Sequence, residues 1–208
     1  MPKQRRPKQP GRIREQRVNR TVRFVHDVRD LMQVRRFTTV RGFQEESVAE
    51  HSYYTALYAM LICDLESLAG DAPDVELVLR TCLLHDLEET RVSDIPRPFK
   101  HSDPELKDTI SRASSEVFER LVAELPSNVG CKYVGLWKNS KGESYEQRIV
   151  KAADLLEALV WSSEEDMQGN MRTRKGHITD ELLDEVKKTR VRSAVSIAEA
   201  IYKETLDY

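Results

Sequence analysis

Apolar residues recur at intervals of three and four along most of this chain, and no segment shows the alternation of apolar and polar residues that marks a half-buried strand. The periodicity predicts six helices, over residues 20–34, 47–70, 75–89, 104–125, 144–166 and 179–206. The intervening segments are polar or rich in proline and glycine and are expected to be loops, over residues 35–46, 93–104, 126–142 and 169–178. The sequence therefore predicts an all-α bundle of at least six helices.

Three of these helices carry a recognisable start, one of which is an N-cap at Asp74. Ser47 is followed three residues later by Glu50, and this pair is typical of a capping box, in which each side chain bonds the backbone amide of the other residue. Pro104 suits the first turn of a helix, where its missing amide hydrogen is not needed. Each signal places a helix start directly after a predicted loop.

Charge is unevenly distributed along the chain. Residues 1–20 contain eight Lys and Arg residues and one acid, for a charge of +7, whereas the remainder has 25 basic and 34 acidic residues, for about −9. We therefore expect a basic N-terminal arm, residues 1–19, before a single domain, residues 20–208. Because the remainder is a poor electrostatic partner for a nucleic acid, an arm that is solvated or packed on another subunit is favoured over one that contacts nucleic acid.

The sequence offers no segment for a membrane. No run approaches the ~18 consecutive apolar residues of a spanning helix, and no apolar stretch typical of a secretion signal follows the basic N-terminus. The three cysteines, Cys63, Cys82 and Cys131, form no C-x-x-C pair, which argues against a disulfide framework or a cysteine zinc cluster. We expect a cytoplasmic protein with no membrane partner.

Four ionisable residues fall on faces that the periodicity assigns to the core. His51 lies near the start of the second predicted helix, and His85 and Asp86 follow an apolar run that ends at Leu84. Asp154 lies on an inward stripe with Val150, Ala153, Glu157 and Trp161. Burial of such a group without a partner costs several kcal/mol, so each of the four needs one.

These four residues can be satisfied separately by ordinary hydrogen bonds, or together by converging on one cation. Imidazole nitrogen and carboxylate oxygen suit a divalent transition metal such as Mn²⁺, Fe²⁺, Co²⁺, Ni²⁺ or Zn²⁺. Two histidines and two aspartates would leave coordination positions open for water and substrate. The spacing of the four residues is weak support by itself, so their neighbours matter.

Two carboxylates lie just beyond the His-Asp pair. Glu89 is one turn on from His85, and Asp94 opens the segment Asp94-Ile95-Pro96. A carboxylate near a metal-activated water can accept or relay its proton. Glu88 is expected to be a solvated neighbour of Glu89, although the two residues could exchange roles.

Arg36 and Phe37 lie in the predicted loop that precedes His51. The planar guanidinium of an arginine fits a phosphate dianion, and an aromatic ring can stack on a base or press on a sugar. The alternatives are that Arg36 is an ordinary surface residue and that Phe37 is a hydrophobic staple. Composition alone favours these alternatives over a role in binding.

In this order the motifs resemble those of the HD-domain metal-dependent phosphohydrolases, and most of all the YfbR-type bacterial 5′-deoxynucleotidases and their relatives. The motifs are Arg36-Phe37, Val48-Ala49-Glu50-His51-Ser52, His85-Asp86-x-x-Glu89, Asp94-Ile95-Pro96 and Lys151-Ala152-Ala153-Asp154. The resemblance spans about residues 20–170.

The resemblance implies a role for each matching residue. It makes metal ligands of His51, His85, Asp86 and Asp154, proton-handling carboxylates of Glu89 and Asp94, and a phosphate-binding residue of Arg36. Phe37 stands in the place of a tryptophan that disfavours a 2′-hydroxyl in the family, so discrimination of deoxyribose stays open. Arg97 is expected to help neutralise phosphoryl oxygens. Relatives form homodimers, which implies a homodimer here.

We therefore expect a metal-dependent phosphomonoesterase that releases phosphate from nucleoside 5′-monophosphates, with 2′-deoxy forms preferred. One alternative is a hydrolase of nucleoside triphosphates or signalling nucleotides on the same scaffold. Thr90 counts against the guanosine-tetraphosphate branch, whereas the basic segment 169–177 could hold further phosphates. Another alternative is a non-catalytic protein with a structural metal, against which Arg36, Glu89 and Asp94 argue because a structural site needs none of them.

Overall fold

The computed structural model describes the fold of residues 10–100 and 102–208, and the side chains of residues 18–100 and 102–208. These residues form α-helices and one 3₁₀ helix without a strand, which confirms the predicted all-α class. The helices are α1 (Pro10–Arg29), η1 (Asp30–Gln33), α2 (Val48–Leu68), α3 (Val75–Cys82), α4 (Glu89–Val92), α5 (Arg97–Lys100), α6 (Pro104–Val122), α7 (Ser127–Asn139), α8 (Tyr145–Met167), α9 (Met171–Lys175), α10 (Ile178–Thr189) and α11 (Arg192–Leu206). None of them is both long and apolar enough to cross a lipid bilayer.

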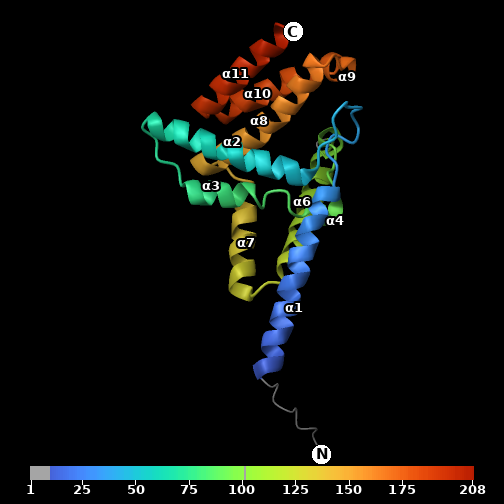
Figure 1. Ribbon diagram of the computed structural model, residues 1–208, viewed down its shortest axis with the longest axis vertical. Helices are drawn as coiled ribbons and strands as arrows, with labels where there is room; N and C mark the ends of the chain where they lie inside the picture. The colour runs from blue at the N-terminus through green and yellow to red at the C-terminus, as the bar shows by residue number, and fades with distance from the viewer. Residues whose placement is uncertain (1–9, 101) are drawn as a thin grey trace, which may run out of the picture.

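Helix α8 is the centre of the fold and packs against α2, α3, α10 and α11 (Figure 1). The buried side chains of these five helices form one core cluster, in which Ile62, Leu159 and Val186 are fully buried. A second cluster joins η1, α6, α7 and the first turn of α2, and it includes the stacked rings of Phe118 and Trp137. The first turn of α2 therefore lies where the two clusters meet.

Helix α1 extends away from this body, with its C-terminal part against η1 and α6 (Figure 1). It is continuous through residue 19, where the sequence predicts the end of a basic arm. Residues 1–9 of that arm lie outside the described residues, and the division into arm and domain stays a prediction.

The predicted helix starts are confirmed. Ser47 and Glu50 form a capping box at the start of α2, and Pro104 lies in the first turn of α6. A second capping box, Ser144 with Gln147, begins α8. Side-chain oxygens thus satisfy backbone amides that have no partner inside the helix.

The prediction of a continuous helix over residues 75–89 is wrong, because α3 ends at Cys82. Nδ1 of His85 lies 2.6 Å from the Cys82 carbonyl, the acceptor that the amide of Asp86 would need to continue the helix. The backbone instead forms tighter bonds between residues three apart, from Leu87 to Leu84 and from Glu89 to Asp86. His85 and Asp86 therefore lie on a turn, not on a helix.

The predicted loop over residues 126–142 is also wrong, because most of it is α7. Its glycines suggest a loop, but Gly130 is buried in α7 for a packing reason: a Cβ there would lie 2.9 Å from the carbonyl oxygen of Val122 in α6. Leu136 and Trp137 of α7 are buried in the second core cluster. Glycine serves here to bring two helices close together.

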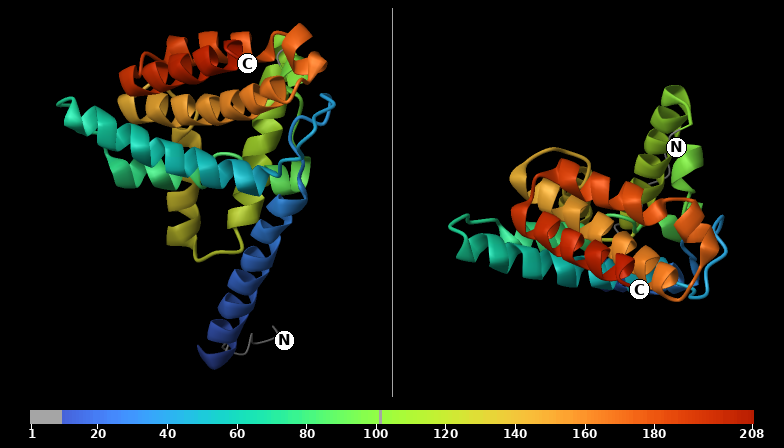
Figure 2. Two further views of the ribbon diagram at one scale, coloured as in Figure 1. Left: turned by 45° about the horizontal axis from the view of Figure 1, so that its top comes forward. Right: turned by 90° about the horizontal axis from the view of Figure 1, so that it is seen from above.

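The C-terminal part of the chain has more helices than predicted. The predicted single helix 179–206 is two, since Arg190 adopts a left-handed conformation (φ 59°) and Val191 is fully buried between α10 and α11. This turn returns α11 alongside α10 (Figure 2). The predicted loop 169–178 contains α9, a short helix capped by Asn170.

Candidate active site

The structure brings together the four residues predicted as metal ligands. His51 lies in the first turn of α2, His85 and Asp86 lie on the turn between α3 and α4, and Asp154 lies in the middle of α8. Nε2 of His51 is 3.2 Å from Nε2 of His85, 3.3 Å from Oδ1 of Asp154 and 3.5 Å from Oδ2 of Asp86. Nε2 of His85 is 3.0 Å from Oδ2 of Asp86. Residues from three distant parts of the chain thus form one cluster, His51, His85, Asp86 and Asp154, which we name the ligand cluster after its predicted role.

Hydrogen bonds on the far side of each imidazole orient the two histidines. The Cys82 carbonyl accepts a hydrogen bond from Nδ1 of His85, which leaves the lone pair of Nε2 facing the cluster. Nδ1 of His51 lies 2.5 Å from a carboxylate oxygen of Glu157, which favours the same tautomer. In their neutral forms both imidazoles would therefore present an Nε2 lone pair to the same point, where the two nitrogens lie 3.2 Å apart.

The electrostatics of the ligand cluster favour a cation. Burial and Arg36 lower the pKa of His51, but the carboxylates of Asp154, Asp86 and Glu157 outweigh them and raise it well above its ordinary value. Burial also opposes ionisation of Asp86 and Asp154, yet nearby positive groups hold the pKa of both well below the usual range. Two imidazoles and two ionised carboxylates are a donor set that fits a divalent transition metal.

Glu157 is the main site residue that sequence reasoning missed. It lies on α8 one turn beyond Asp154 and is buried. Its Oε2 lies 2.5 Å from Nδ1 of His51 and accepts a hydrogen bond from Nη1 of Arg36, also at 2.5 Å. The sequence could have identified Glu157, because it falls on the inward stripe of α8 and a carboxylate on a core face needs a cationic partner.

Arg36 is held between two carboxylates, which orient its side chain beside the ligand cluster. Nη1 donates to Glu46 at 2.8 Å as well as to Glu157. Burial raises the pKa of Glu46 to about 8, with a further contribution from Glu157, although Arg36 opposes the shift. An arginine whose side chain is only 12% exposed and is paired with two carboxylates is not the surface residue that composition favoured.

Phe37 has a strained backbone and a covered ring. Its φ of 53° places it in the left-handed region, which is unusual for a bulky residue. The ring stacks on Trp161 at 3.8 Å between centroids and 7° between planes, and the Arg36 guanidinium lies 4.7 Å from the ring centroid. Phe37 therefore forms a fixed wall beside Arg36.

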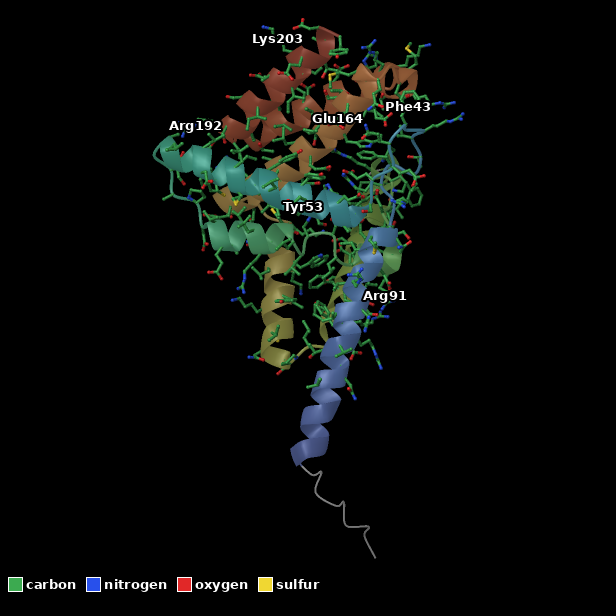
Figure 3. The ribbon with its side chains drawn as sticks, viewed as in Figure 1. Phe43, Tyr53, Arg91, Glu164, Arg192 and Lys203 are labelled. Carbon is green, nitrogen blue, oxygen red and sulfur yellow. The ribbon has the colours of Figure 1, made fainter. Side chains whose placement is uncertain are left out.

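The loop that carries Arg36 and Phe37 is anchored at its base and at its far end. At its base, Arg36 and Glu46 form a backbone hydrogen bond of 2.9 Å. At the far end, the buried Glu165 accepts hydrogen bonds from the amides of Phe43 and Gln44, and Phe43 lies beside α9 in Figure 3. One carboxylate of α8 thus holds the outer part of this loop.

Glu89 begins α4 and Asp94 lies two residues beyond its end, and the charge of Asp86 influences the pKa of both. Burial raises the pKa of Glu89 to about 10, helped by the negative charges of Asp86, Asp94 and Glu88. Burial also raises the pKa of Asp94, against the effect of Arg36. With its pKa raised to about 10, Glu89 keeps its proton at neutral pH.

Glu88 is not the solvated neighbour that the sequence suggested. It is buried, and it accepts a hydrogen bond of 2.6 Å from the indole Nε1 of Trp137 in α7. Burial and Asp86 raise its pKa to about 7. Trp137 thus holds Glu88 against the second core cluster.

Arg97 lies on α5 and is exposed. Its guanidinium donates a hydrogen bond of 2.7 Å to Glu185 in α10. The structure therefore engages Arg97 with α10 and not with the ligand cluster.

Comparison with known proteins gives a consistent family. Residues 23–204 match the family described as 5′-deoxynucleotidase YfbR-like. A 5′-deoxynucleotidase of Pasteurella multocida is 25% identical over 140 residues, which cover 66% of this chain and 71% of that protein. A 5′-deoxynucleotidase of Vibrio cholerae is 25% identical over 148 residues, 71% of this chain and 76% of that protein.

Solved structures share the fold. An HD-domain phosphohydrolase from Listeria innocua has a TM-score of 0.80 and 25% identity, and the match covers 90% of each chain. A more distant neighbour, the HD phosphohydrolase DatZ of cyanophage S-2L, has a TM-score of 0.62 and 18% identity over 88% of this chain and 96% of DatZ. The DatZ structure holds dA and one catalytic Zn²⁺ ion.

Proposed function

This chain belongs to the YfbR-like 5′-deoxynucleotidase family of HD-domain phosphohydrolases, and from that membership we propose that it hydrolyses nucleoside 5′-monophosphates, preferably 2′-deoxy forms, to nucleoside and phosphate. The observation that carries this proposal is the convergence of His51, His85, Asp86 and Asp154 beside Arg36. A structural metal site would need neither the arginine nor the carboxyl groups of Glu89 and Asp94.

In this proposal the ligand cluster holds one divalent transition-metal ion of the Mn²⁺, Fe²⁺, Co²⁺, Ni²⁺ or Zn²⁺ class. When bound, such an ion supplies a Lewis acid and lowers the pKa of water. The opposed imidazole nitrogens of His51 and His85 support this assignment, as does the catalytic Zn²⁺ of the DatZ structure.

The residues around the ligand cluster would position and neutralise the substrate. Arg36 is charged at all relevant pH values and would bind phosphoryl oxygens with the nitrogens that Glu46 and Glu157 leave free. Phe37, fixed by its stack on Trp161, would lie against the sugar. Phosphoryl transfer depends mostly on such positioning and charge neutralisation.

Glu89 and Asp94 would handle the protons. One carboxylate would accept a proton from the attacking water while the other carboxyl donates one to the leaving 5′-oxygen. Burial raises the pKa of both groups, which favours the protonated form that the donor needs. Arg97 would act only at the rim of the site, since Glu185 already pairs with it.

The test is hydrolysis by the full chain supplied with Mn²⁺ or Co²⁺, assayed on deoxy- and ribonucleoside monophosphates and on a deoxynucleoside triphosphate. We expect orthophosphate from monophosphates, and a loss of about 100-fold or more in kcat for Glu89→Gln. Glu105→Gln, an exposed change on α6, is the matched control. No phosphate from any nucleotide would contradict the proposal, and pyrophosphate or tripolyphosphate from the triphosphate would favour the alternative hydrolase.

We also propose a homodimer in a reducing, cytoplasmic setting. The outward face of α2 exposes Tyr53, Tyr54, Leu57, Met60 and Leu61 (Figure 3 labels Tyr53). An apolar stripe of this size on one helix is typical of a protein interface. The C-terminal helix α11 is instead packed inside the monomer through Ala194 and Ala198. The cysteines, Cys63, Cys82 and Cys131, are unpaired, as a reducing setting requires.

A further inference from the structure

A groove with a volume of about 690 Å³ lies between α8 and α10, which pack side by side (Figure 1). Its walls include Arg148 and Lys151 of α8, Lys188 of α10 and Arg190 in the turn after α10. Its size lies within the ~300–1,000 Å³ of small-molecule sites. None of the residues of the ligand cluster lines it.

The groove is cationic in a molecule that is otherwise acidic. Four of its side chains are basic, whereas residues 21–208 as a whole carry about −9. Glu143 and Glu185 are its acids, and Glu185 is neutralised by Arg97 at 2.7 Å and by Lys188 at 2.6 Å. Four bases against two acids leave a net charge of about +2 on the side chains that line the groove.

Part of this charge is held in place before any ligand arrives. Nη1 of Arg148 donates to the carbonyl of Thr189 at 3.2 Å, and its guanidinium lies 5.5 Å from the ring centroid of Tyr145. The backbone of Arg190 has a left-handed conformation and precedes the buried Val191, while its side chain is exposed. Less side-chain entropy is lost on binding when cationic groups are already oriented.

One residue joins the groove to the reaction centre. Nζ of Lys151 lies 2.7 Å from Oδ2 of Asp154, a member of the ligand cluster. The groove therefore begins beside the place where a phosphate ester would react, and it continues away from it along α8 and α10.

We propose that this groove is a second binding site, for the polyphosphate group of a nucleoside triphosphate or a similar polyanion. Arginine forks and lysine ammonium groups are the standard protein partners of phosphate oxygens. Basic residues on α8, on α10 and in the following turn match several linked phosphates better than a single one. The proposal does not rest on the proposed hydrolytic function, because binding here needs no metal.

The experiment is calorimetric titration of tripolyphosphate into the full chain, kept metal-free with a chelator. We expect saturable binding of one tripolyphosphate per chain, weakened about tenfold or more in Lys188→Gln/Arg190→Asn. Asparagine is chosen because it tolerates the left-handed backbone at position 190. Lys187→Gln is the matched control, because Lys187 lies next to Lys188 but pairs with Glu199 outside the groove.

Three results would overturn the proposal: no saturable binding, equal loss in the Lys187→Gln control, or full binding in the double variant, which would assign the anion to another basic segment. Arg36→Gln separates the groove from the reaction centre. We expect the affinity of Arg36→Gln for tripolyphosphate to stay within about twofold of that of the unmodified chain. A loss as large as that of the double variant would place the anion at Arg36 and contradict the groove.

Discussion

Glu157 connects the two kinds of chemistry that the site needs. One of its oxygens contacts both Nδ1 of His51 and Nη1 of Arg36. A change in the position of this carboxylate would therefore disturb the orientation of the His51 imidazole and of the Arg36 guanidinium at the same time. Residues that orient a histidine ligand in this way typically change metal affinity 10–100-fold when they are altered.

We expect Glu157→Gln to weaken Mn²⁺ or Co²⁺ binding about tenfold, because a neutral amide holds the His51 tautomer less firmly and places an N–H donor near Arg36. Competition with a chromogenic chelator measures this affinity without any assay of activity. Glu164→Gln, an exposed change on the same helix (Figure 3), is the control and should bind metal normally. Equal affinities in all three proteins would remove Glu157 from the metal site.

Sequence reasoning identified the ligand cluster because its members are ionisable residues at positions where the periodicity requires apolar ones. It did not assign a function to Glu157, although the same argument applies to it. Its partner Arg36 lies 121 positions away in a loop, and a helical pattern does not show which loop crosses which helix. The burial of Glu88 was missed for a related reason, since its partner Trp137 lies on a helix that was not predicted.

At the scale of elements, the predictions succeeded where a long helix begins with a cap, as α2, α6 and α8 do. They failed where tertiary contacts decide. The side chain of His85 ends α3, the approach of α7 to α6 requires Gly130, and the burial of Val191 separates α10 from α11. Helical propensity alone does not predict these tertiary contacts.

Two glycines of α7 should respond to alanine in opposite ways. Gly130→Ala should lower the free energy of unfolding by about 1–3 kcal/mol, because the new methyl group would press on the Val122 carbonyl. Gly135→Ala should raise it by about 0.5–1 kcal/mol, because its methyl group meets no atom within 4 Å and alanine favours the helix. Urea unfolding measures both. Changes of the same sign would contradict the close α6–α7 packing.

Glu66 joins three elements and should make stability depend on pH. It lies in α2 and accepts hydrogen bonds from the Tyr145 hydroxyl of α8 and the Ser193 amide of α11. Burial opposes its ionisation, but these bonds and Arg192 outweigh it and lower its pKa below the ordinary value of 4.5. A carboxylate with a lowered pKa stabilises the fold above its ordinary pKa and loses this effect as pH falls through the lowered value.

Glu66→Gln should therefore lower the Tm most at neutral pH, and the difference from the unmodified chain should shrink as the pH falls below about 4.5. Thermal unfolding followed by circular dichroism over this pH range measures the effect. Glu76→Gln is the control, because Glu76 forms only an exposed pair with Arg80 in α3 and should change the Tm little at any pH. A difference that grows in acid would show that Glu66 is not held as a carboxylate.

At the scale of the whole molecule, the outward face of α2 is the proposed interface of the homodimer. We expect the chain to sediment at twice its 24.0 kDa mass, and Leu57→Glu/Leu61→Glu to weaken the dimer at least about tenfold by placing charge in an apolar interface. Leu206→Glu is the control, because it introduces the same charge at an exposed leucine of α11, and it should leave the dimer intact. A dimer unaffected by the α2 changes would place the interface elsewhere.

Because Glu165 anchors the loop of residues 35–46, this loop does not have to be ordered when a nucleotide binds. A loop that is free in solution must be ordered each time a ligand arrives, and that ordering weakens every binding event. Here the ordering takes place once, when the protein folds and the amides of Phe43 and Gln44 meet their buried acceptor. The nucleotide therefore meets a loop that is already ordered. Loss of the Glu165 carboxylate, eight residues along α8 from Glu157, should slow and weaken nucleotide binding before it changes the rate of the chemical step.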